Sequence, residues 1–234
     1  MTRGRKAAIA ALALAAIVLV CLPQTVDAHG VSRRDAAFVR TVDGPAPSPF
    51  AYLGAKHMVT GYDHLLFLVG VIFFLYRLRD VLIYVSLFTL GHSATLVAGV
   101  LGNVHANPYV IDAIIGLSVV YKGFENVGGF DRVVGWRPDT RLAVLVFGLF
   151  HGLGLATKLE DLSLPANGLV ANLISFNVGV ELGQGLALTA VLLILMYWRT
   201  RPGFVKHAFA ANSLLMLGGF LLVGYQLAGY VVNR

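Results

Sequence analysis

Four residues whose side chains can bind a metal ion lie near the centres of four separate apolar stretches of this chain: His64, His92, His151 and Glu181. Each stretch is roughly 20 residues long, which is the length of an α-helix that crosses a bilayer. Ionisable groups at such a depth are costly and rare. We therefore interpret the four residues as parts of one polar site inside a membrane protein.

The composition agrees with this class of protein. The chain is 57% hydrophobic and 13% charged, with a mean hydropathy of +0.76, whereas a soluble domain carries about 25% charged residues. The net charge of +6 arises from Lys and Arg in short segments between apolar stretches, which indicates membrane topology and argues against nucleic-acid binding. Cys21 is the only cysteine, and it precedes the expected mature chain, so imidazole and carboxylate are the metal ligands that remain.

The N-terminus predicts a secretory signal peptide over residues 1–28. It combines basic residues, an apolar run over residues 7–22 and a small-residue cleavage site that ends at Ala28. The mature chain would then begin at His29. An uncleaved first helix is the alternative, because the run is only slightly shorter than a membrane span. Residues 29–51 are polar and Pro-rich, and we expect them to form an extracytoplasmic tail.

Residues 52–234 predict an all-α, polytopic bundle of six transmembrane helices. The connections are short, so consecutive helices should be antiparallel. An outer N-terminal tail would place both ends of the mature chain outside the cytoplasm and the basic loops inside, as the positive-inside rule requires for a bacterial inner-membrane protein. The expected spans are 52–76, 81–102, 108–127, 142–159, 169–198 and 205–232; the inner loops would carry Arg77, Arg79, Arg132, Arg137, Arg141, Arg199, Arg201 and Lys206.

This topology brings the four residues to one depth. His64 and Glu181 lie about 12 residues from the outer ends of their spans, and His92 and His151 about 10 residues from the inner ends of theirs. His57 precedes His64 by seven residues, so it shares a helix face with His64 on the outer approach. Polar residues on the fifth span follow i, i+4, i+7 spacing and should face the interior of the bundle: Asn177, Glu181 and Gln184.

A single intramembrane histidine is often a hydrogen-bonding link between helices. Three histidines with Asp63 and Glu181 at one level instead resemble the imidazole and carboxylate ligand set of nickel, cobalt or zinc. Asp63 is expected either to bind the metal or to orient an imidazole. Near the inner end of the third span, Lys122 and Glu125 should form an ion pair.

Glycines flank both polar positions of the fourth and fifth spans. We expect these two spans to pack closely where their polar residues meet, because small residues allow helices to approach each other in membranes. The glycines are Gly148, Gly152 and Gly154 around His151, and Gly179, Gly183 and Gly185 around Glu181.

Four ordered motifs resemble the HupE/UreJ family. They are GAKHMVTGYDHLLF at residues 54–67, FTLGHSATL at 88–96, FGLFHG at 147–152 and FNVGVELGQ at 176–184. The resemblance implies a membrane protein associated with hydrogenase or urease clusters and regarded as a nickel permease. One departure is Asp112, at a position where the family pattern leads us to expect glutamate.

These observations predict a protein that binds a divalent transition metal and passes it inward across the membrane. Nickel is favoured, with cobalt or zinc as alternatives, and metalloenzyme maturation proteins are candidate partners. His29 would offer its α-amine and imidazole to the ion first, and His57 would receive it next. The central site would comprise His64, His92, His151 and Glu181, with Asp63 orienting and with Ser93, Asn177 and Gln184 lining the cavity.

Two other functions fit the same residues. In an intramembrane zinc hydrolase the histidines would hold zinc with an open position for water, and Ser93 or Asp63 would assist the chemistry. In a noncatalytic accessory subunit the polar core would only fix helix packing. Metal flux separates the first prediction from both alternatives.

Overall fold

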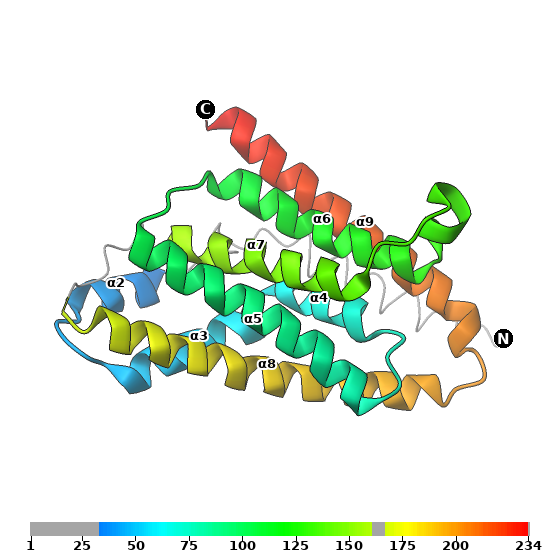
Figure 1. The fold of residues 1–234 in the computed structure, drawn as a ribbon, viewed down its shortest axis with the longest axis horizontal. Helices are drawn as coiled ribbons and strands as arrows, with labels where there is room; N and C mark the ends of the chain where they lie inside the picture. The colour runs from blue at the N-terminus through cyan, green and yellow to red at the C-terminus, as the bar shows by residue number, and fades with distance from the viewer. Residues whose placement is uncertain (1–32, 161–166, 234) are drawn as a thin grey trace.

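The computed structural model describes residues 33–160 and 167–233. The predicted signal peptide and His29 lie outside these residues. Within them all regular structure is helical (Figure 1). The helices are α2 (Arg33–Thr41), α3 (Pro47–Thr60), α4 (Tyr62–Ile72), α5 (Leu78–Gly102), α6 (Pro108–Asn126), α7 (Thr140–Glu160), α8 (Leu169–Arg199) and α9 (Phe204–Val232), with a π-helical turn, η1 (Phe130–Val134), between α6 and α7.

Four of these helices, α5, α7, α8 and α9, are long and apolar enough to cross a membrane. The prediction of an all-α membrane protein is confirmed to that extent. Helix α6 coincides with the predicted third span but carries three charged residues, Asp112, Lys122 and Glu125. The expected tail contains regular structure, because α2 occupies part of it and α3 begins at Pro47. Lys56 of α3 donates to Asp35 of α2 at 2.6 Å, which joins these two helices.

The predicted first span is broken into α3 and α4 at Gly61. The glycine has φ −72° and ψ 95°, outside the helical region. A Cβ at this position would lie 2.9 Å from the His57 carbonyl oxygen and 3.1 Å from His64 Nδ1. The break therefore depends on glycine, because a side chain there would press against the residues that flank it.

Arg199, at the end of α8, donates hydrogen bonds to carbonyl groups at and just beyond the C-terminal end of α4, where helical partners run out. Its guanidinium donates to the carbonyl oxygens of Ile72, Phe73 and Leu75 at 2.6, 2.7 and 2.9 Å. It also stacks over the Tyr76 ring at 4.6 Å. Arg199 thus links the short helix α4 to the long helix α8.

The helices pack mainly as three pairs: α3 with α8, α5 with α7, and α6 with α9. A Cβ at Gly179 would lie 1.9 Å from the carbonyl oxygen of Ala51, and one at Gly152 would lie 2.0 Å from that of His92. The prediction that the fourth and fifth spans pack on each other was therefore wrong. The glycines of α7 and α8 do allow close approach, but their partners are α5 and α3.

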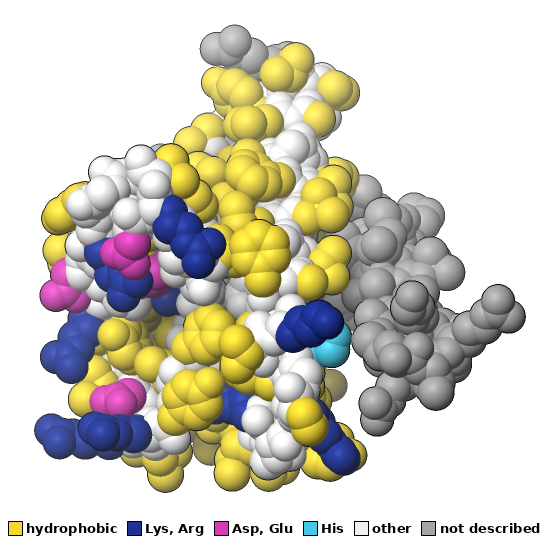
Figure 2. Space-filling view, turned by 90° about the vertical axis from the view of Figure 1, so that its right-hand side faces the viewer, with side chains coloured by type: hydrophobic (Ala, Val, Ile, Leu, Met, Phe, Trp, Pro, Cys, Tyr) yellow, Lys and Arg dark blue, Asp and Glu magenta, His cyan; other side chains and the backbone are white. Residues whose placement is uncertain are grey.

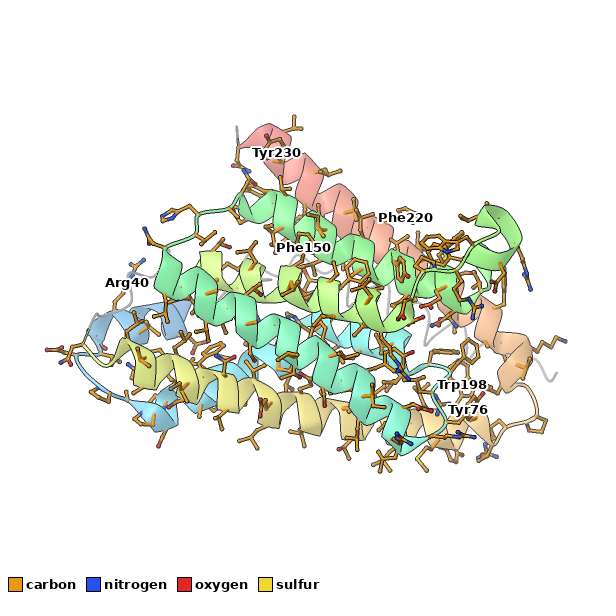
Figure 3. The ribbon with its side chains drawn as sticks, viewed as in Figure 1. Arg40, Tyr76, Phe150, Trp198, Phe220 and Tyr230 are labelled. Atoms are coloured by element: carbon orange, nitrogen blue, oxygen red, sulfur yellow. The ribbon has the colours of Figure 1, made fainter. Side chains whose placement is uncertain are left out.

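Basic residues gather at one end of the bundle, as Figure 2 shows for the end at the right of Figure 1. The segments that meet there are the α4–α5 connection, η1 and the α8–α9 connection (Figure 1). Tyr76 and Trp198 also lie toward this end, whereas Arg40 and Tyr230 lie toward the opposite one (Figure 3). Aromatic residues beside a cationic end are typical of a membrane boundary.

The glycines that face a partner helix should tolerate no added volume. Gly179→Ala should lower the free energy of unfolding by about 1–3 kcal/mol, because the new methyl group meets the backbone of α3. Gly185→Ala is the matched control on the same helix, where nothing lies within 4 Å of the added Cβ. Thermal unfolding in detergent should show a lower midpoint for the first variant only. Equal midpoints would contradict the observed packing of α8 on α3.

Candidate metal centre

Three histidine rings, each from a different helix, surround His64. The ring centroid of His64, on α4, lies 5.0 Å from that of His57 on α3, 5.8 Å from that of His92 on α5 and 4.8 Å from that of His151 on α7. One ligand atom from each of His57, His64 and His92 lies within 4.8 Å of the others. The sequence predicted that His64, His92 and His151 would converge, but it kept His57 apart on the outer approach. In the structure the break at Gly61 lies between His57 and His64, and the two rings are neighbours.

Hydrogen bonds fix which ring nitrogen of two histidines carries the proton. His64 Nδ1 lies 3.0 Å from Asp63 Oδ1, and His151 Nδ1 lies 2.7 Å from the carbonyl oxygen of Phe147. Both oxygens are acceptors, so each Nδ1 donates, and in the neutral form of each ring Nε2 keeps a lone pair. Asp63 therefore orients the imidazole of His64. This is one of the two roles that the sequence predicted for Asp63.

Several ring nitrogens of these histidines have no hydrogen-bond partners in the described part of the chain. This holds for Nε2 of His64, Nε2 of His151 and both ring nitrogens of His92. All three side chains are almost completely buried. Buried polar atoms are normally satisfied, and a group of converging imidazole lone pairs is the donor set that binds a divalent transition metal.

A hollow of about 10 Å³ lies beside the rings of His57, His64 and His151, and His92 does not line it. It is lined by His57, Asp63, His64, Ile115, His151, Gly154, Leu155 and Lys158. Such a space holds about one water-sized particle. A bound metal lies about 2.0–2.1 Å from an imidazole nitrogen, so two ligand nitrogens lie at most about 4.2 Å apart. The ligand nitrogens of His57, His64 and His92 lie within 4.8 Å of one another, which is close to that spacing.

Phenylalanine rings close the cluster on the side of the basic end. Phe67, Phe88 and Phe147 each lie one helical turn from a histidine, in the direction of that end. The Phe67 centroid lies 5.4 Å from that of Phe88 and 5.8 Å from that of Phe147. Phe67 and Phe88 are fully buried. This phenylalanine layer separates the imidazoles from the basic end with an apolar barrier.

Glu181 does not belong to this cluster, and the expectation that it faces the interior was wrong. It is exposed on α8, whereas Gln184 is buried and Asn177 is half-buried. At 100° per residue the side chains of Glu181 and Gln184 point about 60° apart around the helix axis. Glu181 therefore lies outside the face of α8 that packs on α3. The Gln184 Oε1 atom accepts from Thr89 at 3.0 Å and so links α8 to α5.

The remaining predicted residues lie near the cluster without completing it. Ser93, next to His92 on α5, is half-buried, and its buried hydroxyl has no partner among the described residues. The expected Lys122–Glu125 ion pair is confirmed, and Thr140 also donates to Glu125. Sequence reasoning missed a second ion pair, in which Lys158 bonds Asp112. The signal in the sequence was the isolated position of Lys158 in a predicted outer loop region that otherwise has few positive charges.

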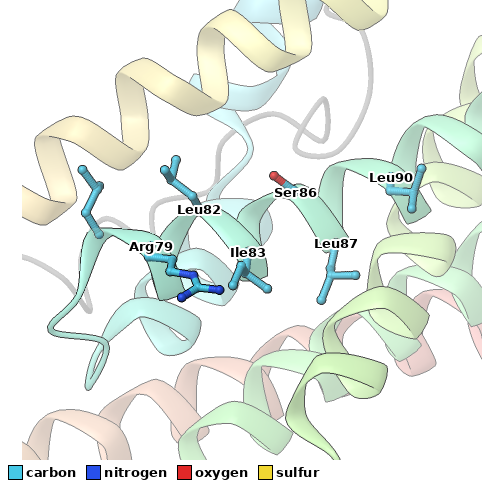
Figure 4. Close-up of a pocket in the computed structure, with 7 residues that line it drawn as sticks. Arg79, Leu82, Ile83, Ser86, Leu87 and Leu90 are labelled. Atoms are coloured by element: carbon cyan, nitrogen blue, oxygen red, sulfur yellow. The ribbon is translucent and has the colours of Figure 1, made fainter.

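A larger hollow, of about 570 Å³, lies elsewhere, on the N-terminal half of α5 (Figure 4). Its lining contains Leu82, Ile83, Leu87 and Leu90 with Ser86 and Arg79. It offers neither imidazole nor carboxylate. Its chemistry suits lipid chains, and the histidine cluster remains the candidate metal centre.

The family model described as HupE / UreJ protein matches residues 33–234, which include every histidine of the cluster. The chain belongs to the HupE/UreJ family. No curated protein and no solved structure matches the chain. Membership confirms the resemblance carried by the four motifs, and it favours a membrane transport or accessory role over hydrolysis.

If the cluster is the metal site of this HupE/UreJ protein, His64→Ala should abolish most binding, because His64 is central to the ring contacts. His207→Ala, near the start of α9, is the control and should leave binding intact. Glu181→Gln should also leave the affinity unchanged. Titration with Co²⁺, followed by its absorption spectrum on protein purified without a histidine tag, measures each variant. Full Co²⁺ occupancy in His64→Ala would rule out the cluster as the site.

Proposed function

We propose that this HupE/UreJ protein is a permease that binds a divalent transition metal ion at the histidine cluster and carries it across the inner membrane. The observation that supports the proposal is the group of buried imidazole nitrogens without hydrogen-bond partners in the described residues. They lie on helices of a bundle in which four helices can cross a membrane. A purely structural role would favour hydrogen bonds that satisfy these nitrogens.

The types of ligand restrict which metal ions this site can bind. Neutral imidazoles with carboxylates nearby suit nickel, cobalt and zinc, whereas magnesium and calcium prefer sites made only of oxygen. Within this range the family favours nickel, with cobalt as the second substrate. The ion is cargo, so the site must also release it, and moderate affinity suits that requirement.

The proposed membrane arrangement has six crossing segments: α5, α6, α7, α8 and α9, with α3 and α4 together as a broken span. Broken helices at membrane depth are tolerated where they line a site. The basic end would be cytoplasmic, with the mature N-terminus and the C-terminus outside. His29, at the start of the mature chain, and then His57 would receive the ion from the outer side.

The phenylalanine layer gives this pathway a direction. The hollow adjoins the imidazoles, and the layer lies between them and the basic end. We infer that the structure corresponds to a state closed toward the cytoplasm. Movement of the phenylalanine rings would release the ion to the inner side, where metalloenzyme maturation proteins are the proposed recipients.

Purified protein in proteoliposomes should accumulate Ni²⁺ or Co²⁺, read with an enclosed metal-sensitive dye. His64→Ala and His151→Ala should each reduce initial uptake at least about tenfold, because loss of one ligand from a small site weakens it severely. His207→Ala should match the unmodified protein.

Tightly held zinc without any flux would overturn the permease and favour a metal-dependent hydrolase. Absence of both flux and bound metal would favour an accessory subunit. Calcium uptake serves as a specificity control and should remain at the level of empty liposomes, because imidazole ligands do not suit that ion.

A further inference from the structure

Lys158 brings a positive charge to the wall of the same hollow that the histidines line. Its ammonium lies 2.9 Å from each carboxylate oxygen of Asp112. The side chains are mostly buried, with exposed fractions of 17% for Lys158 and 6% for Asp112. A cation at this position would oppose a second cation in the hollow.

Asp112 is adjacent to the hollow even though it does not line it. Gly154 lines the hollow, and a Cβ added there would lie 3.6 Å from Asp112 Oδ1. Because glycine has no side chain, little material separates the carboxylate from the imidazoles. The ion pair that links α6 to α7 is therefore part of the surroundings of the metal site.

The formal charges around the hollow determine how favourable it is for a metal ion to enter. Asp63 and Asp112 contribute two negative charges, and Lys158 contributes one positive charge. A dication would neutralise the two carboxylates only if the ammonium leaves. In an interior of low dielectric constant, uncompensated charge is far more costly than in water, so ammonium and dication cannot share this hollow cheaply.

We propose that the Lys158 ammonium is a tethered competitor of the metal ion, which occupies Asp112 when the site is empty and moves away when a dication enters. The proposal rests on the proposed function and adds the control of occupancy. Lys158 lies two residues before the end of α7. Its flexible stem can therefore carry the ammonium to the outer interface while the methylene groups stay against protein.

A structural ion pair is the alternative, and affinity distinguishes the two. Either role predicts lower stability when one partner is removed. A structural pair predicts unchanged or weaker metal binding in Lys158→Gln, because the site would be looser. A competitor predicts tighter binding, because the repulsive charge is gone and Asp112 is released.

The test is a Co²⁺ titration of matched variants in detergent. Lys158→Gln should bind at least about tenfold more tightly than the unmodified protein, and Lys158→Arg, which keeps the charge, should not. Asp112→Asn should bind more weakly, since the ammonium then lacks its partner. Adding Lys158→Gln to Asp112→Asn should recover part of that loss.

A second measurement uses the unmodified protein and does not depend on a variant that folds. An amine-acetylating reagent is applied with and without saturating Co²⁺, and acetylation of Lys158 is quantified by peptide mass spectrometry. Exposed Lys206 serves as the internal reference. Acetylation of Lys158 should rise severalfold with Co²⁺.

Unchanged affinity in Lys158→Gln, or unchanged acetylation while Co²⁺ is bound, would overturn the competition. His64→Ala is titrated in the same series. If it abolishes binding while Lys158→Gln has no effect, the metal site stands and only the competitor fails. If Co²⁺ binding survives His64→Ala, the proposed metal site itself fails.

Discussion

Imidazole rings buried in an apolar bundle must have partners for their polar atoms, and this requirement organises the centre of the molecule. The Nδ1 atoms of His64 and His151 are satisfied by Asp63 and by a backbone carbonyl. Their Nε2 atoms and both nitrogens of His92 are not, among the described residues. A buried polar atom without a partner costs about 1–3 kcal/mol. The fold concentrates this cost in one place, where a single cation would offset it.

The helix pairs supply the rigidity that such a site needs. In α5·α7 and α3·α8 the backbones meet at glycines. His92 and His151 lie on the two helices of the first pair, so they have little freedom to separate, and the second pair fixes the helix that carries His57. His92 and Gly152 are in contact across the first pair, which ties one ligand helix to the helix that carries His151. Helix α4 is outside the pairs, and it contributes the ring that contacts all the others.

Apolar runs and charge distribution were sufficient to predict the helical class, the approximate positions of the helices and the convergence of the histidines. They did not predict the break at Gly61, since glycine also occurs inside continuous membrane helices. Glu181 was misplaced because i, i+4, i+7 spacing fixes a broad sector of a helix and not the partner that it faces. The Lys158–Asp112 pair was missed because a charge near a helix end usually reaches solvent.

Because α4 begins just after the break, a tilt of this helix about Gly61 would move its two ends by different amounts. At 1.5 Å per residue, His64 lies about 4.5 Å from Gly61 along the axis, whereas Ile72 lies about 16 Å away. A tilt of α4 about Gly61 therefore displaces the backbone at Ile72 nearly four times as far as the backbone at His64. The hydrogen bonds from Arg199 restrain that far end. If these hydrogen bonds were released, the C-terminal end of α4 would move much further than His64, so in the proposed permease one end of this helix could shift while the imidazole stays near its neighbours.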